Sequence, residues 1–408
     1  MEKAKLDYEV PAHLKREFVF QTAGILPPNG ILFGFNTLKK VGEQAKKLGG
    51  KQVLLVTDET MVQLGYADLV KGLLEKEGMR VDIFGKVDPE PHMETADALY
   101  DLVRKAKSDL VVGLGGGSSM DMAKLTSIVA TNPQAPLELM TKKVVNNPTL
   151  KKILIPTTSG TGSEVSMFFV CSGGKDKYFM GSPLAYPEIA IIDLGVTLSM
   201  PPRITASTGI DALSHAVDSL MNRLANPFYD CLGLGGIELI AKYVRRATFN
   251  GQDLEARYYM SMAATMSMIS MTGTGGLYSH SISFVLAMFQ PVPHGIGCGV
   301  GLPYTMAYNL PVIEDKLARI AKAMGEPTES LPRQKAARRG VEMVYDLIAD
   351  VKMPLSLKEM GFQHEDIYKM ADICITKYPR PNNPRDMSSE TCLSLFEAMW
   401  KGNTSLLW

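Results

Sequence analysis

Short apolar runs alternate with helical segments through the first half of this chain, and beyond that half the alternation stops. The runs QVLLV from Gln52, RVDIF from Arg80 and LVVGL from Leu110 have the length and apolar content of buried strands. Helical spacing fills residues 61–76 and 94–106 between them. This alternation predicts a parallel sheet covered by helices on both faces. Because right-handed crossovers bring the carboxyl ends of the strands to one edge, we expect ligands to bind there.

Further strands are predicted before the character of the sequence changes near residue 199. They lie at residues 152–155, 167–170 and 189–192, and residues 18–34, with a turn at Pro27 to Gly30, indicate an extended lead-in or a hairpin at the sheet edge. Beyond residue 199 the patterns are almost all helical, at 210–223, 227–248, 253–270, 276–288, 313–323, 334–350 and 389–399. We therefore predict an α/β domain over residues 1–198 and an all-helical domain over residues 199–408.

The composition argues against nucleic acid and membranes as partners. Lys and Arg together number 43, as do Asp and Glu, so no net charge would attract a polyanion. The charged N-terminal stretch lacks the apolar run of a signal peptide, and we expect a cytoplasmic protein. The five cysteines show no CxxC pairing, which favours reduced thiols over a disulfide framework.

Four side chains of the helical half have the spacing and chemistry of a metal site. Asp211 and His215 are four residues apart and would project from one face of a helix, while His280 and His294 lie in apolar, glycine-containing surroundings. One carboxylate and three imidazoles suit a divalent metal such as Fe(II) or Zn(II). The alternative is that these histidines are ordinary core residues. Cys298, four residues after His294, is either close to this site or a small buried residue.

A glycine-rich turn follows the third predicted strand. Glycines let the backbone approach an anion, and amides at the start of the following helix can donate to it. The run Gly113-Leu-Gly-Gly-Gly-Ser-Ser does not fit the GxGxxG fingerprint, because its third glycine position is Ser118. It is either a phosphate-binding loop of another pattern or a tight turn that binds nothing. A second loop, Pro156 to Glu164, adds hydroxyls and glycines after the next strand.

Asp58 ends the first of these strands. A carboxylate at this position accepts hydrogen bonds from a ribose 2′-hydroxyl and repels a 2′-phosphate, which favours NAD over NADP. An aspartate there also suits the N-cap of the next helix.

Taken together, four motifs resemble those of the iron-containing, or group III metal-dependent, alcohol dehydrogenases. They are GGGSSMDMAK, PTTSGTGSE, STGIDALSHAVDS and the pair His280 and His294, and the resemblance runs from the Gly34 region to Asn383–Arg385. It implies a dehydroquinate-synthase-like fold, with an α/β NAD-binding domain followed by an all-helical metal-binding and catalytic domain. It also implies an NAD-dependent, metal-dependent alcohol dehydrogenase or aldehyde reductase.

The resemblance assigns roles to individual residues. Asp211, His215, His280 and His294 match the metal ligands, for Fe(II) or possible Zn(II). Asp121 matches a position that lines the cleft near the substrate. The residues that match cofactor contacts are Asp58, Gly115, Gly116, Gly117, Ser118, Ser119, Thr157, Thr158, Thr161, Gly162 and Lys177.

The chain departs from the family pattern at Phe284, where many relatives have a second histidine that faces the nicotinamide. A proton would therefore leave through water, a ribose hydroxyl or another group. The phenyl ring favours a pocket for apolar or lightly substituted primary alcohols and aldehydes over polyols. The alternative is that it is an ordinary core residue. The resemblance also suggests a homodimer or larger homo-oligomer.

Two other activities stay open at this point. A hydroxyacid-oxoacid transhydrogenase would retain its NAD and regenerate it with a second substrate. A lyase of the dehydroquinate synthase kind would need Lys and Arg to bind a substrate phosphate, and residues 210–221 and 280–290 around the predicted ligands contain none.

Overall fold

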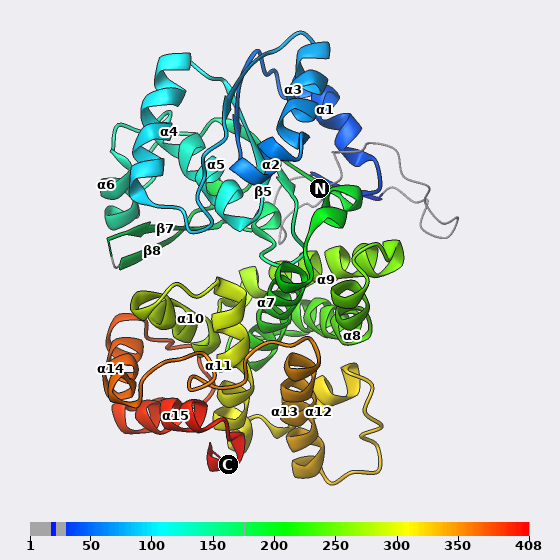
Figure 1. The fold of residues 1–408 in the computed structure, drawn as a ribbon, viewed down its shortest axis with the longest axis vertical. Helices are drawn as coiled ribbons and strands as arrows, with labels where there is room; N and C mark the ends of the chain where they lie inside the picture. Colours follow the sequence, from blue (N-terminus) through cyan, green and yellow to red (C-terminus); the bar gives the residue numbers. More distant parts are fainter. Residues whose placement is uncertain (1–17, 22–29, 175, 408) are drawn as a thin grey trace. The chain divides into compact units, whose positions relative to one another are not determined.

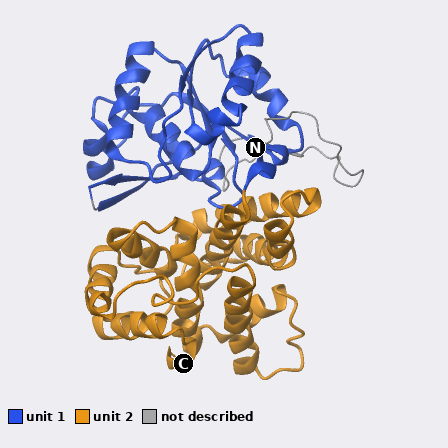
Figure 2. Cartoon of the chain, in the orientation of Figure 1, with its two compact units in different colours: residues 1–200 blue, residues 201–408 orange. Residues whose placement is uncertain are grey.

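A computed structural model describes residues 18–21, 30–174 and 176–407, which belong to two units, Met1–Met200 and Pro201–Trp408 (Figure 2). The predicted boundary lies two residues before this division. Among the residues that the structure describes, no helix is long and apolar enough to cross a membrane.

The first unit is built on a seven-stranded sheet (Figure 1). Its order is β1-β2-β9-β6-β5-β3-β4, and all pairs are parallel except β1 with β2, which are antiparallel. The structure thus has the predicted hairpin rather than the extended lead-in. Of the turn predicted at Pro27 to Gly30, residues 27–29 lie outside the described residues and Gly30 begins β2. The strands are β1 (Phe18–Gln21), β2 (Gly30–Gly34), β3 (Gln52–Val56), β4 (Arg80–Phe84), β5 (Leu110–Gly115), β6 (Lys151–Pro156) and β9 (Ile189–Asp193).

Helices cover both faces of this sheet. Alternate residues of β3 show why: Leu54 belongs to one buried apolar cluster with α4 and α5, whereas Val53 belongs to another with α1 and α3. The helices are α1 (Val41–Lys47), α2 (Glu59–Gln63), α3 (Tyr66–Lys76), α4 (Met93–Ala106), α5 (Gly117–Val129) and α6 (Pro136–Lys142).

Two predictions for this unit were wrong in detail. The single helix predicted over residues 61–76 is interrupted, because Gly65 has a φ of 81° and begins the separate helix α3. The strand predicted over residues 167–170 does not join the main sheet. It belongs to β7 (Phe168–Gly173), which pairs antiparallel with β8 (Asp176–Gly181) in a separate two-stranded ribbon.

The second unit is helical, which confirms the predicted combination of an α/β domain with an all-α domain. Two of its helices, α11 and α14, were missed by the sequence analysis. The α-helices are α7 (Pro202–Met221), α8 (Pro227–Phe249), α9 (Leu254–Thr274), α10 (Tyr278–Phe289), α11 (His294–Asn309), α12 (Glu314–Ala323), α13 (Arg333–Asp350), α14 (Ile367–Lys377) and α15 (Ser389–Lys401).

Candidate functional site

Helix α7 carries the first two predicted metal ligands into the interior of the second unit. Pro202 opens the helix, and the helix packs against α8, α9 and α11, so that nearly every residue from Thr205 onward is buried. Asp211 and His215 lie one turn apart, with 3.7 Å between Asp211 Oδ1 and His215 Nε2. Both are 2% exposed. A carboxylate and an imidazole therefore share a face of a helix that is closed to water.

The other two predicted ligands come from α10 and α11. His280 lies in the first turn of α10 and is buried, whereas His294 is the first residue of α11 and keeps 35% of its side chain exposed. His294 Nε2 lies 3.7 Å from Asp211 Oδ1. The two imidazole rings have centroids 5.6 Å apart. Helices α7, α10 and α11 thus bring these side chains together around Asp211, and His294 is the most exposed of them.

Among the described residues, one group of potential metal-binding atoms that lie close together differs from the predicted set by one residue. Asp211, His280, His294 and Cys298 each offer an atom within 4.8 Å of the others. His215 is outside this group, although its ring stacks on that of His280 with centroids 5.1 Å apart. The role of His215 as a ligand stays a prediction.

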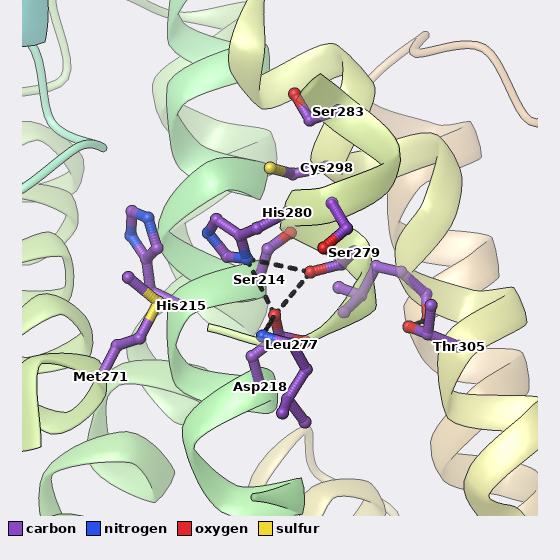
Figure 3. A network of polar contacts seen from close by, with 12 residues as sticks. Ser214, His215, Asp218, Met271, Leu277, Ser279, His280, Ser283, Cys298 and Thr305 are labelled. Atoms are coloured by element: carbon purple, nitrogen blue, oxygen red, sulfur yellow. Dashed lines mark hydrogen bonds and ion pairs between the residues drawn. The ribbon is translucent and has the colours of Figure 1, made fainter. Parts of the chain in front are cut away.

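Asp218 organises the inner side of this cluster, as Figure 3 shows. Its Oδ2 accepts hydrogen bonds from His280 Nδ1 at 2.8 Å, from Ser279 Oγ at 2.6 Å and from Leu277 N at 2.7 Å. Because a carboxylate only accepts, the proton of a neutral His280 is on Nδ1. Its Nε2 then presents a lone pair, the form in which histidine binds metals. Sequence analysis missed Asp218, although its position seven residues after Asp211 places both on one helix face.

These residues fit a divalent cation. His280 Nε2 and Asp211 Oδ1 are buried and have no hydrogen-bond partner among the described residues. Burial raises the pKa of Asp211 to about 6, a shift that the nearby His280 opposes. A buried polar atom without a hydrogen-bond partner destabilises the folded protein. A cation bound by both of these atoms would remove that destabilisation.

Phe284 closes one side of the cluster with an apolar ring. It lies one helical turn after His280, and its ring stacks on His294 with centroids 5.7 Å apart and an interplanar angle of 29°. Its other neighbour is Tyr378, with centroids 5.5 Å apart. Phe284 has no titratable group, so it cannot carry a proton next to His294.

In the first unit, the glycine loop connects β5 to α5 as a backbone cradle. Gly115 has a φ of 146°, a conformation that favours glycine, and Gly116 is the N-cap of α5. A Cβ on Gly115 would lie 2.5 Å from Ser119 Oγ and 2.8 Å from Asp58 Oδ2. Glycine at this position therefore lets the loop pass within contact distance of Ser119 and Asp58, which brings its backbone to the N-terminus of α5, where anions bind in other proteins.

Asp58 lies beside this cradle and caps a helix. Its Oδ1 accepts from Met61 N at 3.0 Å, which makes it the N-cap of α2, and its Oδ2 accepts from Ser119 Oγ at 3.3 Å. The structure thus shows the capping role that the sequence left open. Contact of the same carboxylate with a ribose stays a prediction.

The second loop lies against the first. Thr157 N donates to Gly115 O at 2.9 Å, because β5 and β6 are parallel neighbours. Thr161 is so close to Gly117 that a Cβ there would lie 2.9 Å from Thr161 Cγ2, and Gly162 has a φ of 58°. Thr158 faces Gly116, and its buried Oγ1 has no hydrogen-bond partner among the described residues. A glycine cradle beside an unsatisfied hydroxyl fits a nucleotide.

Two further predicted residues have partners within the protein. Lys177 Nζ lies 3.0 Å from Glu90 Oε1. Asp121 accepts from Ser163 Oγ at 2.6 Å and from Val170 N at 3.0 Å, and burial raises its pKa. These bonds tie α5 to the loop and to β7. The predicted roles of both residues stay predictions.

Comparisons with known proteins cover both units. The family model "Iron-containing alcohol dehydrogenase" matches residues 28–194, and the model "Fe-containing alcohol dehydrogenase family, C-terminal" matches residues 205–400. The chain is 36% identical to a choline dehydrogenase of Bacillus subtilis (strain 168) over 89% of this chain and 91% of that protein. It is 31% identical to an NAD-dependent methanol dehydrogenase of Bacillus methanolicus, over 89% and 97%. An alcohol dehydrogenase from Oenococcus oeni shares its fold, with a TM-score of 0.88, 30% identity, and coverage of 92% of this chain and 99% of that one.

Proposed function

This chain belongs to the iron-containing alcohol dehydrogenase family and is an oxidoreductase acting on alcohols, and from that premise we propose that it interconverts small primary alcohols and aldehydes with NAD and a divalent metal, Fe(II) or Zn(II). The observation that carries the proposal is the convergence of ligand atoms in the second unit. Four of them lie within 4.8 Å of one another, and two of these are buried without a hydrogen-bond partner among the described residues.

Bound metal and NAD would supply Lewis acidity toward the substrate oxygen and a hydride acceptor or donor. The protein's own contribution is to hold and orient these groups. Asp211, His280 and His294 would hold the metal, with His215 as the predicted fourth ligand. Asp218 keeps the proton of His280 on Nδ1, away from the metal-binding nitrogen.

The first unit supplies the proposed nucleotide site. The amides of Ser118 and Ser119 at the start of α5 would donate to the pyrophosphate, and Gly115 allows the tight turn that leads into this helix. Asp58 would accept from the ribose hydroxyls, and its negative charge opposes a 2′-phosphate. The dependence on NAD printed in the name of the Bacillus methanolicus relative supports the same choice.

Phe284 supports the proposed substrate class. Its ring lies 5.7 Å from that of His294, the most exposed of the ligand candidates, and it presents an apolar surface there. Apolar or lightly substituted primary alcohols and aldehydes suit such a wall better than polyols do. By family resemblance we also propose a homodimer or larger homo-oligomer.

The test is an assay of chelator-stripped protein. The chain is purified anaerobically and stripped, and NADH oxidation is followed with a panel of short aldehydes after Fe(II) or Zn(II) is added back. We expect activity to disappear on stripping and to return with metal. His280→Ala should stay inactive, whereas His364→Ala, a surface histidine paired with Glu397, should behave like the parent chain.

Activity that survives complete stripping would contradict the proposal. So would the absence of aldehyde turnover with either metal. If the nucleotide stays bound through gel filtration and is regenerated only when an oxoacid is added as a second substrate, the chain is a transhydrogenase instead.

A further inference from the structure

We propose that Cys298 is a sulfur ligand of the metal and that it biases the site towards Zn(II) over Fe(II). The inference rests on the proposed function and deepens it, because one carboxylate and three imidazoles leave the choice between these two ions open.

The first argument is distance. Cys298 Sγ lies 3.5 Å from His294 Nε2, and Asp211 Oδ1 lies 3.7 Å from the same nitrogen. Two ligands that bind one tetrahedral zinc at about 2.0–2.3 Å are about 3.4–3.6 Å apart. The sulfur is therefore as far from its neighbour as a ligand of the same ion would be. It belongs to the group of four ligand atoms that lie within 4.8 Å of one another, whereas His215 does not.

The second argument is that buried polar atoms without hydrogen-bond partners belong to the same group as Cys298. His280 Nε2 and Asp211 Oδ1 are buried and lack hydrogen-bond partners among the described residues. Both residues are in the group that contains Cys298. Figure 3 shows the Cys298 side chain extending from α11 on the same side as the His280 ring. The Cys298 thiol already makes polar contacts with this group, because it hydrogen-bonds with Asp211 and with His294 Nε2. A metal that replaced the thiol proton would contact the same atoms.

The packing of α11 explains why the sulfur reaches this position. The glycines on either side of Cys298 allow close approach to two other helices. A Cβ on Gly297 would lie 2.6 Å from Ser283 Oγ on α10, and one on Gly299 would lie 2.8 Å from a side-chain carbon of Ile210 on α7. Cys298 is thereby held between the helices that carry His280 and Asp211, one turn after His294.

The chemical consequence concerns the identity of the metal. Sulfur binds as the thiolate, and its proton passes to solvent when the metal enters. Thiolate is a soft ligand that favours zinc, whereas carboxylate and imidazole discriminate less. A site with sulfur, imidazole and carboxylate ligands should therefore prefer Zn(II) more strongly than the same site without the sulfur.

Cobalt(II) reports directly on sulfur ligation, without any measurement of activity. The full chain is stripped with a chelator and loaded with Co(II), and its absorption spectrum is recorded. We expect visible d–d bands from the bound ion together with a near-ultraviolet sulfur-to-cobalt charge-transfer band. Cys298→Ser should keep the d–d bands and lose the charge-transfer band. Cys392→Ser, which alters a buried thiol that contacts Ala371 O on another helix, should keep both.

The possible failures are distinguishable. Visible d–d bands without a charge-transfer band in the parent chain would overturn the sulfur ligand and leave the proposed function standing. A parent chain that takes up no cobalt would overturn both.

A competition experiment tests the selectivity and covers a poorly folding variant. Stripped parent chain is equilibrated anaerobically with mixed Zn(II) and Fe(II), and the bound metals are quantified. We expect Cys298→Ser to lower the Zn(II)-to-Fe(II) affinity ratio by about tenfold or more, the scale on which supporting groups alter metal sites. If Cys298→Ser does not fold, Cys298→Ala serves in its place. An unchanged ratio in a folded variant would refute the bias.

Discussion

Asp218 illustrates how one residue can control a metal site that it does not touch. Its Oδ2 receives three hydrogen bonds, one of them from His280 Nδ1, and the residue is fully buried. An amide is uncharged and has only one acceptor oxygen, so it would hold the proton on His280 Nδ1 less strongly than the carboxylate does. We expect Asp218→Asn to weaken metal binding by about 10- to 100-fold.

A competition titration against a metal-indicator dye measures this effect. The control is Asp230→Asn, which alters another buried carboxylate of the same unit, one that pairs with Arg319 at 2.6 Å. It should lose some stability but keep its metal affinity. Equal losses of affinity in the two variants would show that Asp218 acts only through general stability.

Glu164 is a buried carboxyl group of the first unit that should make stability depend on pH. It is 3% exposed, its Oε2 has no partner among the described residues, and burial raises its pKa to about 7, against a weaker opposing effect of Lys124. Lys124 is itself buried and also faces Asp121, with 3.9 Å between their charged atoms. A pKa raised by folding means that the folded state holds the proton more tightly. The stabilisation is thus complete below about pH 4.5 and is lost as the pH rises through 7.

We therefore expect Glu164→Gln to flatten the pH dependence between pH 4.5 and 8. The shift of the Glu164 pKa corresponds to about 3 kcal/mol of unfolding free energy. The parent chain should lose this stability between pH 4.5 and 8, and the variant should not. Thermal midpoints of metal-free and nucleotide-free protein at pH 5 and pH 8 measure the difference. A parent and a variant with parallel pH profiles would show that Glu164 is not the responsible group.

At the scale of elements, α11 depends on glycines that sequence periodicity treats as helix breakers. Its sequence, HGIGCGVGLPYTMAYN, has four glycines and an internal Pro303, so its intrinsic helix propensity is low. Tertiary contacts override that propensity. A Cβ on Gly295 would lie 2.2 Å from the backbone oxygen of Ser207 on α7, so only glycine allows the two helices to approach.

Gly295→Ala should accordingly push α11 away from α7. We expect a loss of about 1–3 kcal/mol in stability, the usual cost of overpacking, together with weaker metal binding. Gly235→Ala on α8 is the matched control, because its Cβ would meet only the flexible end of Met266. The measurement is the thermal unfolding midpoint of each metal-free variant. A Gly295→Ala midpoint at or above that of Gly235→Ala would refute the close-packing argument.

The β5–α5 turn in the first unit also requires a glycine. Alanine at Gly115 would need a positive φ and would direct a Cβ towards Ser119 and Asp58. We expect Gly115→Ala to weaken NADH binding by tenfold or more, about 1.4 kcal/mol. Fluorescence titration measures it, with Gly72→Ala, an exposed helical position with open space around it, as the control. Unchanged affinity for NADH would place the nucleotide elsewhere.

The elements that the sequence predicted well are those whose patterns are local. Buried strands such as β3 and β5 are continuous apolar runs, and the α7 pair Asp211 and His215 needs only helical spacing. The failures depend on contacts between distant segments. The ribbon of β7 with β8 is separated from the main sheet by tertiary pairing, and α11 is stabilised by its neighbours.

The same distinction applies to the candidate site. Sequence motifs predicted the candidate residues for the metal and the nucleotide, but a motif does not show which side chains face one another. The packing of α7, α10 and α11 places Asp218 against His280. It also brings Cys298, and not His215, into the group of ligand atoms that lie within 4.8 Å of one another. Asp58 presents the converse case, since its capping of α2 is visible in the structure and its proposed ribose contact is not.

At the scale of the whole molecule, the proposed ligand sets belong to different units of the chain. The candidate metal ligands all lie in Pro201–Trp408, and the candidate nucleotide residues all lie in Met1–Met200. A ligand stabilises the structure that binds it, by about 2.7 kcal/mol at a concentration of 100 times Kd. We expect zinc to slow hydrogen exchange in α7, α10 and α11, and NADH to slow it in the β5–α5 loop and around Thr157. Exchange followed by mass spectrometry, with each ligand added alone, separates the two effects. Zinc protection centred on the glycine loop, or NADH protection centred on α7, would contradict the assignment of the two sites.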